Sequence, residues 1–281
     1  MAALIFLAET FAVSIGAGAF GALLGLGGGV ILVPVLTLVL GIDIHYAIGA
    51  SIVSVIATSS GAAAAYLRDG VTNIRIGMFL EIATTTGAIF GAFVAGYIGG
   101  AGLFLVFAIV LLYSAFAMFR GRNSELPVGV RMGPLANFLH LRSSYYDTAL
   151  NRLVQYNVRG ARYALPLMFV AGAVSGLLGI GSGVLKVPAM DLAMKLPLKV
   201  STATSNLMIG VTAAASAGVY FIRGDVNPFI AAPVAMGVLI GATLGTQVMM
   251  RTNSSAIRWV FIVVLVFVAV EMLLKGIGIQ L

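Results

Sequence analysis

The chain has no cysteine, and only 9% of its 281 residues are charged. The absence of cysteine excludes a disulfide framework and a thiolate site for a metal or redox chemistry. So few charges cannot cover the surface of a soluble domain of this length, of which 60% is apolar. The composition therefore predicts an integral membrane protein.

Groups for catalysis are scarce as well. The two histidines, His45 and His140, lie in predicted loops, and no apolar segment holds paired carboxylates or a nucleophile beside a base. An intramembrane hydrolase needs such groups or metal ligands, so we predict neither an enzyme nor a metal or cofactor site. The string GLGGGV at Gly25–Val30 resembles a dinucleotide-binding turn, but no soluble strand precedes it and no ribose-binding acid follows.

No lysine or arginine precedes Arg68 in the chain. Met1–Leu24 therefore lacks the charged region of a cleavable signal peptide and is expected to be a retained membrane segment. The net charge of +7 is concentrated, because seven of the sixteen basic residues lie in Arg120–Arg162. This clustering predicts a cytoplasmic loop with one amphipathic helix on the lipid headgroups, and no nucleic-acid partner.

Long apolar stretches fill the rest of the chain, and one of them occurs twice. GLGGGVILVP at Gly25–Pro34 returns as GIGSGVLKVP at Gly179–Pro188, and eleven of eighteen residues agree when the match is extended back to Ala17 and Ala171. Glycine and proline interrupt helices, so each copy predicts a broken hairpin. Three spans long enough to cross about 30 Å of hydrocarbon follow each hairpin.

We therefore expect an all-α membrane protein of two repeats, residues 1–120 and 163–281, joined by the basic loop 121–162, with about 8–10 membrane segments. The hairpins, near Ala3–Leu40 and Tyr163–Met194, can be re-entrant or can span fully. The other expected spans are Ala47–Leu67, Ile76–Ile98, Ala101–Phe119, Val200–Ile222, Phe229–Met250 and Ile257–Ile277.

Charge placement predicts how the repeats are oriented. If each hairpin enters and leaves on one side, the copies are inverted, and a cytoplasmic middle loop puts thirteen basic residues inside and two outside, with Lys186, inside a span, left out of both counts. Parallel copies give eleven against four. The positive-inside rule favours inverted repeats with both termini outside.

The breaks themselves are candidate sites, because broken backbone survives in hydrocarbon only when buried or lining a wet cavity. The helix after each break offers free N–H groups and a positive dipole end, which suit an anion. Inverted copies would bring two such ends together. The predicted backbone and hydroxyl donors are Gly27, Gly28, Gly29, Gly181, Ser182 and Gly183.

Lys186 replaces the Leu32 of the first copy, and a cation within a span suggests a ligand. Alternatively it snorkels to the interface or pairs with Asp191. The spans after the hairpins add the hydrogen-bonding side chains of Ser51, Ser205 and Asn206, which can either bind the anion or join helices. Glu81 can either relay a proton or reach the membrane interface.

The two glycine-rich motifs followed by Val-Pro, the small polar span after each, and the length resemble the TauE/SafE family of sulfite exporters over all of the chain except the middle loop. The resemblance implies export of small sulfur-containing anions, such as sulfite or organosulfonates including sulfoacetate, across a bacterial cytoplasmic membrane. We interpret the chain as a secondary transporter that works by alternating access. Its expected partners are a small anion and membrane lipid.

Three other interpretations stay open: an anion channel, a transporter of another small anion such as sulfate, thiosulfate or a carboxylate, and an assembly factor that transports nothing. An uncoupled mechanism is an alternative to proton coupling. Small residues permit close helix contact in lipid, and four glycines could pack helices within one chain or between two copies of a homodimer: Gly87, Gly91, Gly237 and Gly241.

Overall fold

A computed structural model describes residues 2–23, 28–68, 70–120, 130–147, 151–181, 183–249 and 254–279. The membrane part is helical, as predicted. Its helices are α1 (Ala2–Leu23), α2 (Gly29–Leu38), α3 (Ile44–Arg68), α4 (Ile74–Ala95), α5 (Gly100–Arg120), α7 (Ala161–Leu178), α8 (Gly183–Ala189), a π-helical turn at Met190–Met194, α9 (Leu198–Arg223), α10 (Pro228–Met249) and α11 (Ser254–Gly276). The middle loop forms α6 (Pro134–Phe138), β1 (Ser143–Asp147) and β2 (Arg152–Tyr156).

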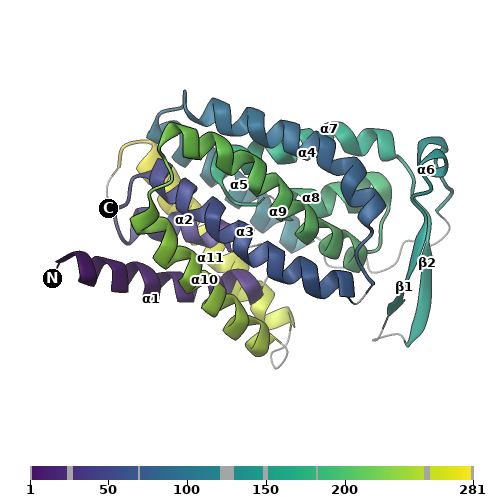
Figure 1. Ribbon diagram of the computed structural model, residues 1–281, viewed down its shortest axis with the longest axis horizontal. Coiled ribbons are helices and arrows are strands. Elements are labelled where there is room, and N and C mark those ends of the chain that lie inside the picture. Colours follow the sequence, from purple (N-terminus) through teal and green to yellow (C-terminus); the bar gives the residue numbers. More distant parts are fainter. Residues whose placement is uncertain are drawn as a thin grey trace.

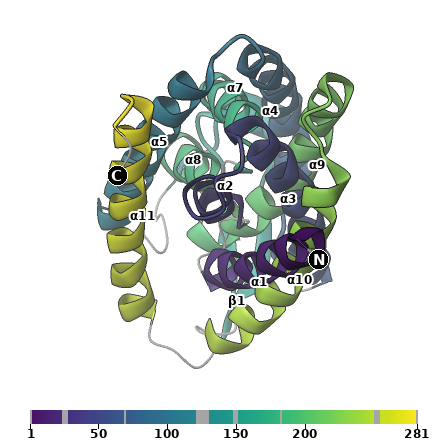
Figure 2. The same ribbon diagram turned by 90° about the vertical axis from the view of Figure 1, so that its left-hand side faces the viewer.

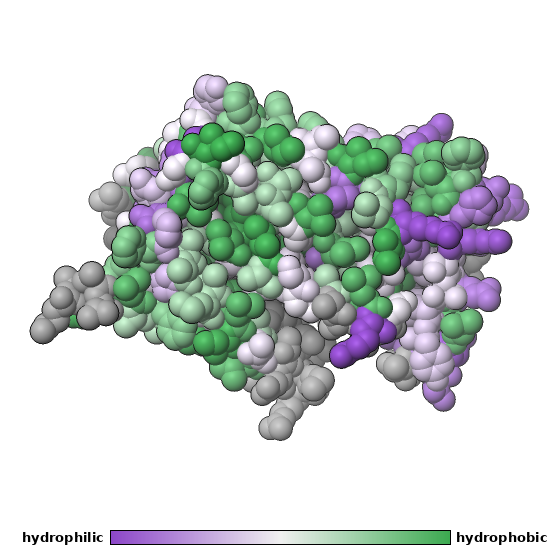
Figure 3. All heavy atoms as spheres, viewed as in Figure 1, coloured by the Kyte–Doolittle hydropathy of each residue, from purple (hydrophilic) through white to green (hydrophobic). Residues whose placement is uncertain are grey.

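Length and surface identify a membrane protein. Within the described residues, five helices are long and apolar enough to cross a bilayer: α3, α4, α5 over Gly100–Ala117, α7 and α9. Large apolar side chains such as Ile82, Phe116 and Ile222 are exposed on the helices, which lipid tolerates and water does not. Figure 3 shows hydrophobic residues over much of the helical body and hydrophilic ones gathered at the end that carries β1 and β2.

Glycines bring the helices into backbone contact in two places. A Cβ atom on Gly91 of α4 would lie 1.9 Å from the carbonyl oxygen of Ala173 in α7, and one on Gly241 of α10 would lie 2.1 Å from that of Ile15 in α1. Gly87 and Gly237 are equally crowded by α7 and α1. Of the two uses predicted for these four glycines, the structure shows helix packing within one chain.

The short helices α2 and α8 lie in the middle of the molecule. Figure 2, a view along the bundle, shows pairs of contacting helices around them: α1 and α10, α4 and α7, α3 and α9, and α5 and α11. Eight of the ten residues of α2 are buried. Ten residues of α-helix rise about 15 Å, half the thickness of the hydrocarbon core, so α2 is too short to cross it alone.

The middle loop is a folded unit docked on the helices. Both chain ends lie at one end of the molecule, and α6, β1 and β2 lie at the other (Figure 1). The strands pair antiparallel with Tyr145 opposite Val154. Asn73, which caps α4, donates from Nδ2 to the Tyr156 hydroxyl at 2.9 Å and to the Leu141 carbonyl at 3.2 Å. Burial raises the pKa of Tyr156, which keeps this phenol neutral.

The prediction of one amphipathic helix in this loop was wrong in detail. α6 has only five residues, and the β-hairpin beside it was not predicted. The physical reason is burial of aromatic residues, since Tyr145 and Tyr156 pack with Ile76 and Leu80 of α4 and Met168 of α7 in one apolar cluster. The loop is held by tertiary contacts, which its local sequence pattern does not reveal.

Candidate functional site

Both duplicated motifs contain the predicted break. α2 begins at Gly29 and α8 at Gly183, which are equivalent positions in the two copies. Before them, Gly28 and Gly181 each have φ of +72°, a left-handed conformation that strongly favours glycine. Gly27 and Ser182, also predicted as donors, lie outside the described residues.

The two breaks meet in the interior. The Ser51 hydroxyl of α3 donates to the carbonyl oxygen of Gly179 at 2.8 Å. A Cβ atom on Gly29 would lie 2.7 Å from that hydroxyl and 3.0 Å from the same carbonyl, and Val55 crowds both Gly29 and Gly181. The start of α2 therefore packs directly on the second break, and the hydrogen of Ser51 is engaged there.

Lys186 lies on α8, one helical turn beyond Gly183. Its side chain is fully buried, with 0% of its surface exposed, so it does not snorkel, and it forms no salt bridge with Asp191 in the described residues. Its Nζ donates to Thr212 Oγ1 on α9 at 2.7 Å. An ammonium has three N–H donors, and the described residues supply an acceptor for one of them.

Glu81 on α4 completes this cluster. Its Oε1 accepts from the Thr85 hydroxyl at 2.8 Å and lies 2.7 Å from the Thr212 hydroxyl, whose single hydrogen is shared between this oxygen and the Met208 carbonyl, also at 2.7 Å. The side chain is only 7% exposed, and its second oxygen, Oε2, has no hydrogen-bond partner among the described residues. One hydroxyl thus stands between a buried cation and a buried carboxylate.

Thr212 was not predicted as a bridge. It is one of several polar residues on α9, and its position does not reveal that it lies between Lys186, 26 residues away, and Glu81, 131 residues away. No local pattern carries that information. Helix α9 also links this cluster to the second break, because Ile209, one turn before Thr212, packs against Gly181.

The remaining predicted donors lie along α9. Ser205 is buried and its Oγ has no partner in the described part of the chain, and the same holds for Ser201. Asn206 donates from Nδ2 to the carbonyl of Thr202 in its own helix at 3.1 Å. Ser201, Ser205 and Thr212 share one face, since positions four and eleven apart differ by about 40° or less around a helix. Two unengaged hydroxyls therefore lie on the face that holds the bridging threonine.

Comparisons with known proteins show the family to which the chain belongs. The profile of the family described as Sulfite exporter TauE/SafE matches residues 10–272. The chain is 26% identical over 268 residues to the "Probable membrane transporter protein YunE" of Bacillus subtilis, covering 93% of this chain and 95% of that protein. It is 28% identical over 257 residues to a "Probable membrane transporter protein" of Xylella fastidiosa, covering 90% of each. No solved structure matches the chain.

The family match covers nearly the whole chain, and the relatives match along almost their full lengths. The helices are long, apolar and exposed where lipid would contact them. The chain therefore belongs to the sulfite exporter TauE/SafE family and is a multi-pass membrane transporter, not an enzyme.

Proposed function

We propose that this protein is a secondary carrier that exports a small sulfur-containing oxyanion, such as sulfite or sulfoacetate, across a bacterial cytoplasmic membrane. The observation that carries the proposal is the buried Lys186, whose ammonium has two N–H donors without a partner in the described residues. A buried cation with spare donors attracts an anion that can accept from it. The description of the matched family supports the choice of sulfur anions.

The rest of the proposed site comes from the two breaks and from the polar helices that follow them. Gly28 with Gly29 and Gly181 with Gly183 offer backbone N–H groups at the positive dipole ends of α2 and α8. The predicted donors Gly27 and Ser182 lie outside the described residues and stay a prediction. Ser205 offers a hydroxyl that is unengaged in this conformation. Ser51 can join them only when it exchanges its present partner, the carbonyl of Gly179, whereas Asn206 keeps a second N–H besides the one that it donates to the Thr202 carbonyl.

Alternating access follows from two inverted repeats in this proposal. The pairing of helices supports them, because α1 of the first half packs on α10 of the second and α7 of the second half packs on α4 of the first. The termini lie at the end opposite the middle loop, as inverted copies require. The short second arm of each hairpin, α2 or α8, fits a re-entrant segment.

Charge supports an orientation with the middle loop in the cytoplasm and both termini outside. Arg75 donates to the His140 carbonyl and Lys199 pairs with Asp147, so these cations lie with the basic loop. Arg223 and Lys275 lie away from this loop, because they donate to the carbonyls of Ala92, near the end of α4, and of Thr37, near the end of α2. The uneven distribution follows the positive-inside rule.

Glu81 gives the carrier a way to couple the anion to a proton. In the empty carrier its carboxylate balances Lys186 across Thr212. An arriving monoanion adds a negative charge, and a proton on the free Oε2 of Glu81 would restore neutrality. The buried cluster then has no net charge in either state, which avoids the large cost of burying an uncompensated charge. Transport of a monoanion such as bisulfite together with one proton is electroneutral, whereas a dianion such as sulfoacetate would carry one net negative charge with the same proton. A cell that produces the anion exports it down its gradient.

The test is uptake of radiolabelled sulfite, sulfoacetate, sulfate and taurine into proteoliposomes. We expect saturable uptake and counterflow of sulfite or sulfoacetate, and at least about 10-fold weaker uptake of taurine, whose own ammonium is repelled by Lys186. A saturating flux with counterflow distinguishes a carrier from a channel. High conductance without counterflow, or no flux of any sulfur anion by the folded protein, would contradict the proposal.

A further inference from the structure

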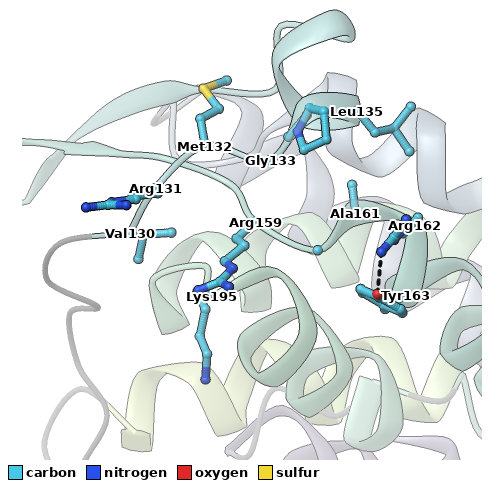
Figure 4. Close-up of a pocket in the computed structure, with 13 residues that line it drawn as sticks. Val130, Arg131, Met132, Gly133, Leu135, Arg159, Ala161, Arg162, Tyr163 and Lys195 are labelled. Carbon is cyan, nitrogen blue, oxygen red and sulfur yellow. Dashed lines mark hydrogen bonds between the residues drawn. The ribbon is translucent and has the colours of Figure 1, made fainter.

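A second basic site lies where the middle loop meets the helices. A pocket of about 870 Å³ is lined by the start of α6 with the segment before it, by the first turn of α7, and by Lys195 at the end of the π-helical turn. Four basic side chains line it, Arg131, Arg159, Arg162 and Lys195, and none of the described lining residues is acidic (Figure 4). The pocket is therefore strongly positive.

Backbone contacts hold its three walls together. The Gly133 N–H donates to the Val158 carbonyl at 3.0 Å, and the Arg159 N–H donates to the Met194 carbonyl at 3.2 Å. Gly160, with φ of +65°, lies so close to the π-helical turn that a Cβ atom there would be 2.4 Å from the Ala193 carbonyl oxygen. These contacts fix the positions from which the basic side chains extend.

The basic side chains are available to a ligand. In the described part of the chain, none of the four forms a salt bridge with an acid, although Lys195 interacts electrostatically with Asp191, four residues before it. Arg162 donates to the hydroxyl of Tyr163 and lies over its ring, with Cζ 4.6 Å from the ring centroid. Arg131, Arg159 and Lys195 make no side-chain hydrogen bond among the described residues.

Size, apolar lining and position point to a lipid. The volume far exceeds that of a bare oxyanion, and Val130, Met132 and Leu135 add apolar surface to the basic wall. The exposed Tyr163 lies in the first turn of α7, where an apolar helix long enough to span begins. Aromatic residues favour the headgroup level, and basic pockets at the cytoplasmic ends of membrane helices suit anionic headgroups.

We propose that this pocket binds the phosphate-containing headgroup of an anionic phospholipid, with the adjoining glycerol and acyl carbons against its apolar wall. The π-helical turn continues directly from α8 and ends at Lys195. A bound headgroup holds Lys195 and Arg159 in place, and therefore limits how freely α8 moves. Because α8 carries Lys186, occupancy of the pocket then affects the anion site. This last step rests on the proposed transport function, whereas headgroup binding does not.

Native mass spectrometry of the full chain in mild detergent tests binding directly, with phosphatidylglycerol and phosphatidylcholine as probes. The wild type should retain phosphatidylglycerol in clear excess. The double substitution Arg159→Gln with Lys195→Gln should weaken it about 25-fold, at roughly five-fold for each basic residue. The control, Arg142→Gln with Arg152→Gln, removes two exposed charges from the same loop outside the pocket and should bind as the wild type does.

Three results would overturn the proposal: equal retention of the two lipids, equal weakening by the two double substitutions, or stabilisation of the wild type by inorganic phosphate alone without preference for phosphatidylglycerol. The last would identify a site for a soluble oxyanion. If the pocket variant does not fold, Arg131→Gln replaces it, because this exposed side chain makes no hydrogen bond in the described structure. Anion flux in liposomes with and without phosphatidylglycerol then separates loss of lipid control from failure of transport itself.

Discussion

Lys186 is the residue on which the account of transport depends. A fully buried ammonium is costly in a membrane protein, and here Glu81 offsets it through one hydroxyl. The first copy of the motif has Leu32 at the equivalent position, and this side chain is buried as completely. The first hairpin arm therefore packs without a charge at this position, which supports our proposal that Lys186 serves anion binding and not packing.

Replacing Glu81 tests the charge balance at the same scale. Glu81→Gln keeps the shape and an acceptor for Thr212 but removes the negative charge. The anion-loaded carrier stays neutral, whereas the empty carrier buries an uncompensated lysine. We expect counterflow to persist, while net flux falls at least about 10-fold, equivalent to roughly 1.4 kcal/mol, and loses its dependence on the proton gradient.

Glu9→Gln is the matched control, since Glu9 is an exposed acid on α1. It should leave counterflow, net flux and proton dependence unchanged. Net flux by Glu81→Gln that equals the wild type and still follows the proton gradient would exclude this carboxylate from coupling.

At the scale of elements, glycine-mediated contact between α4 and α7 is the feature most open to mutation. Gly91→Ala places a methyl group where the Ala173 carbonyl oxygen already lies, so the helices must separate. Overpacking of this kind costs about 1–3 kcal/mol, and we expect the Tm in detergent to fall by roughly 5 °C.

Gly61→Ala on α3 provides the comparison, because a Cβ atom at Gly61 meets nothing within 4 Å. Alanine is the better helix former, so this variant should melt at or slightly above the wild-type temperature. Equal melting of the two variants would show that α4 and α7 do not touch at Gly91.

The helices could be predicted from the sequence, but their partners could not. Apolar runs and glycine breaks are local, which is why the ranges of α3, α9 and both breaks follow from hydropathy and from the duplicated motif. The contact of Lys186 with Thr212 and Glu81 joins three helices, and only the fold brings those residues together. The hairpin of the middle loop was missed for the same reason, since Tyr145 and Tyr156 gain their burial from α4 and α7.

At the scale of the whole molecule, the proposed orientation can be measured because the chain contains no cysteine. Ser144→Cys introduces an exposed thiol on β1, and Ile277→Cys introduces one near the end opposite β1. A membrane-impermeant thiol reagent should label Ile277→Cys in intact spheroplasts, and Ser144→Cys only after permeabilisation. Labelling of both from the same side would contradict inverted repeats.

The most direct test of the central claim is anion uptake by Lys186→Met, which keeps the length of the side chain and removes its charge. Loss of charge-assisted hydrogen bonds to the anion should reduce uptake roughly 10- to 100-fold, while Leu32→Met, the same residue at the equivalent position of the first copy, should transport as the wild type does. If Lys186→Met folds and transports the anion at the wild-type rate, the buried ammonium is not the anion site and the account is wrong.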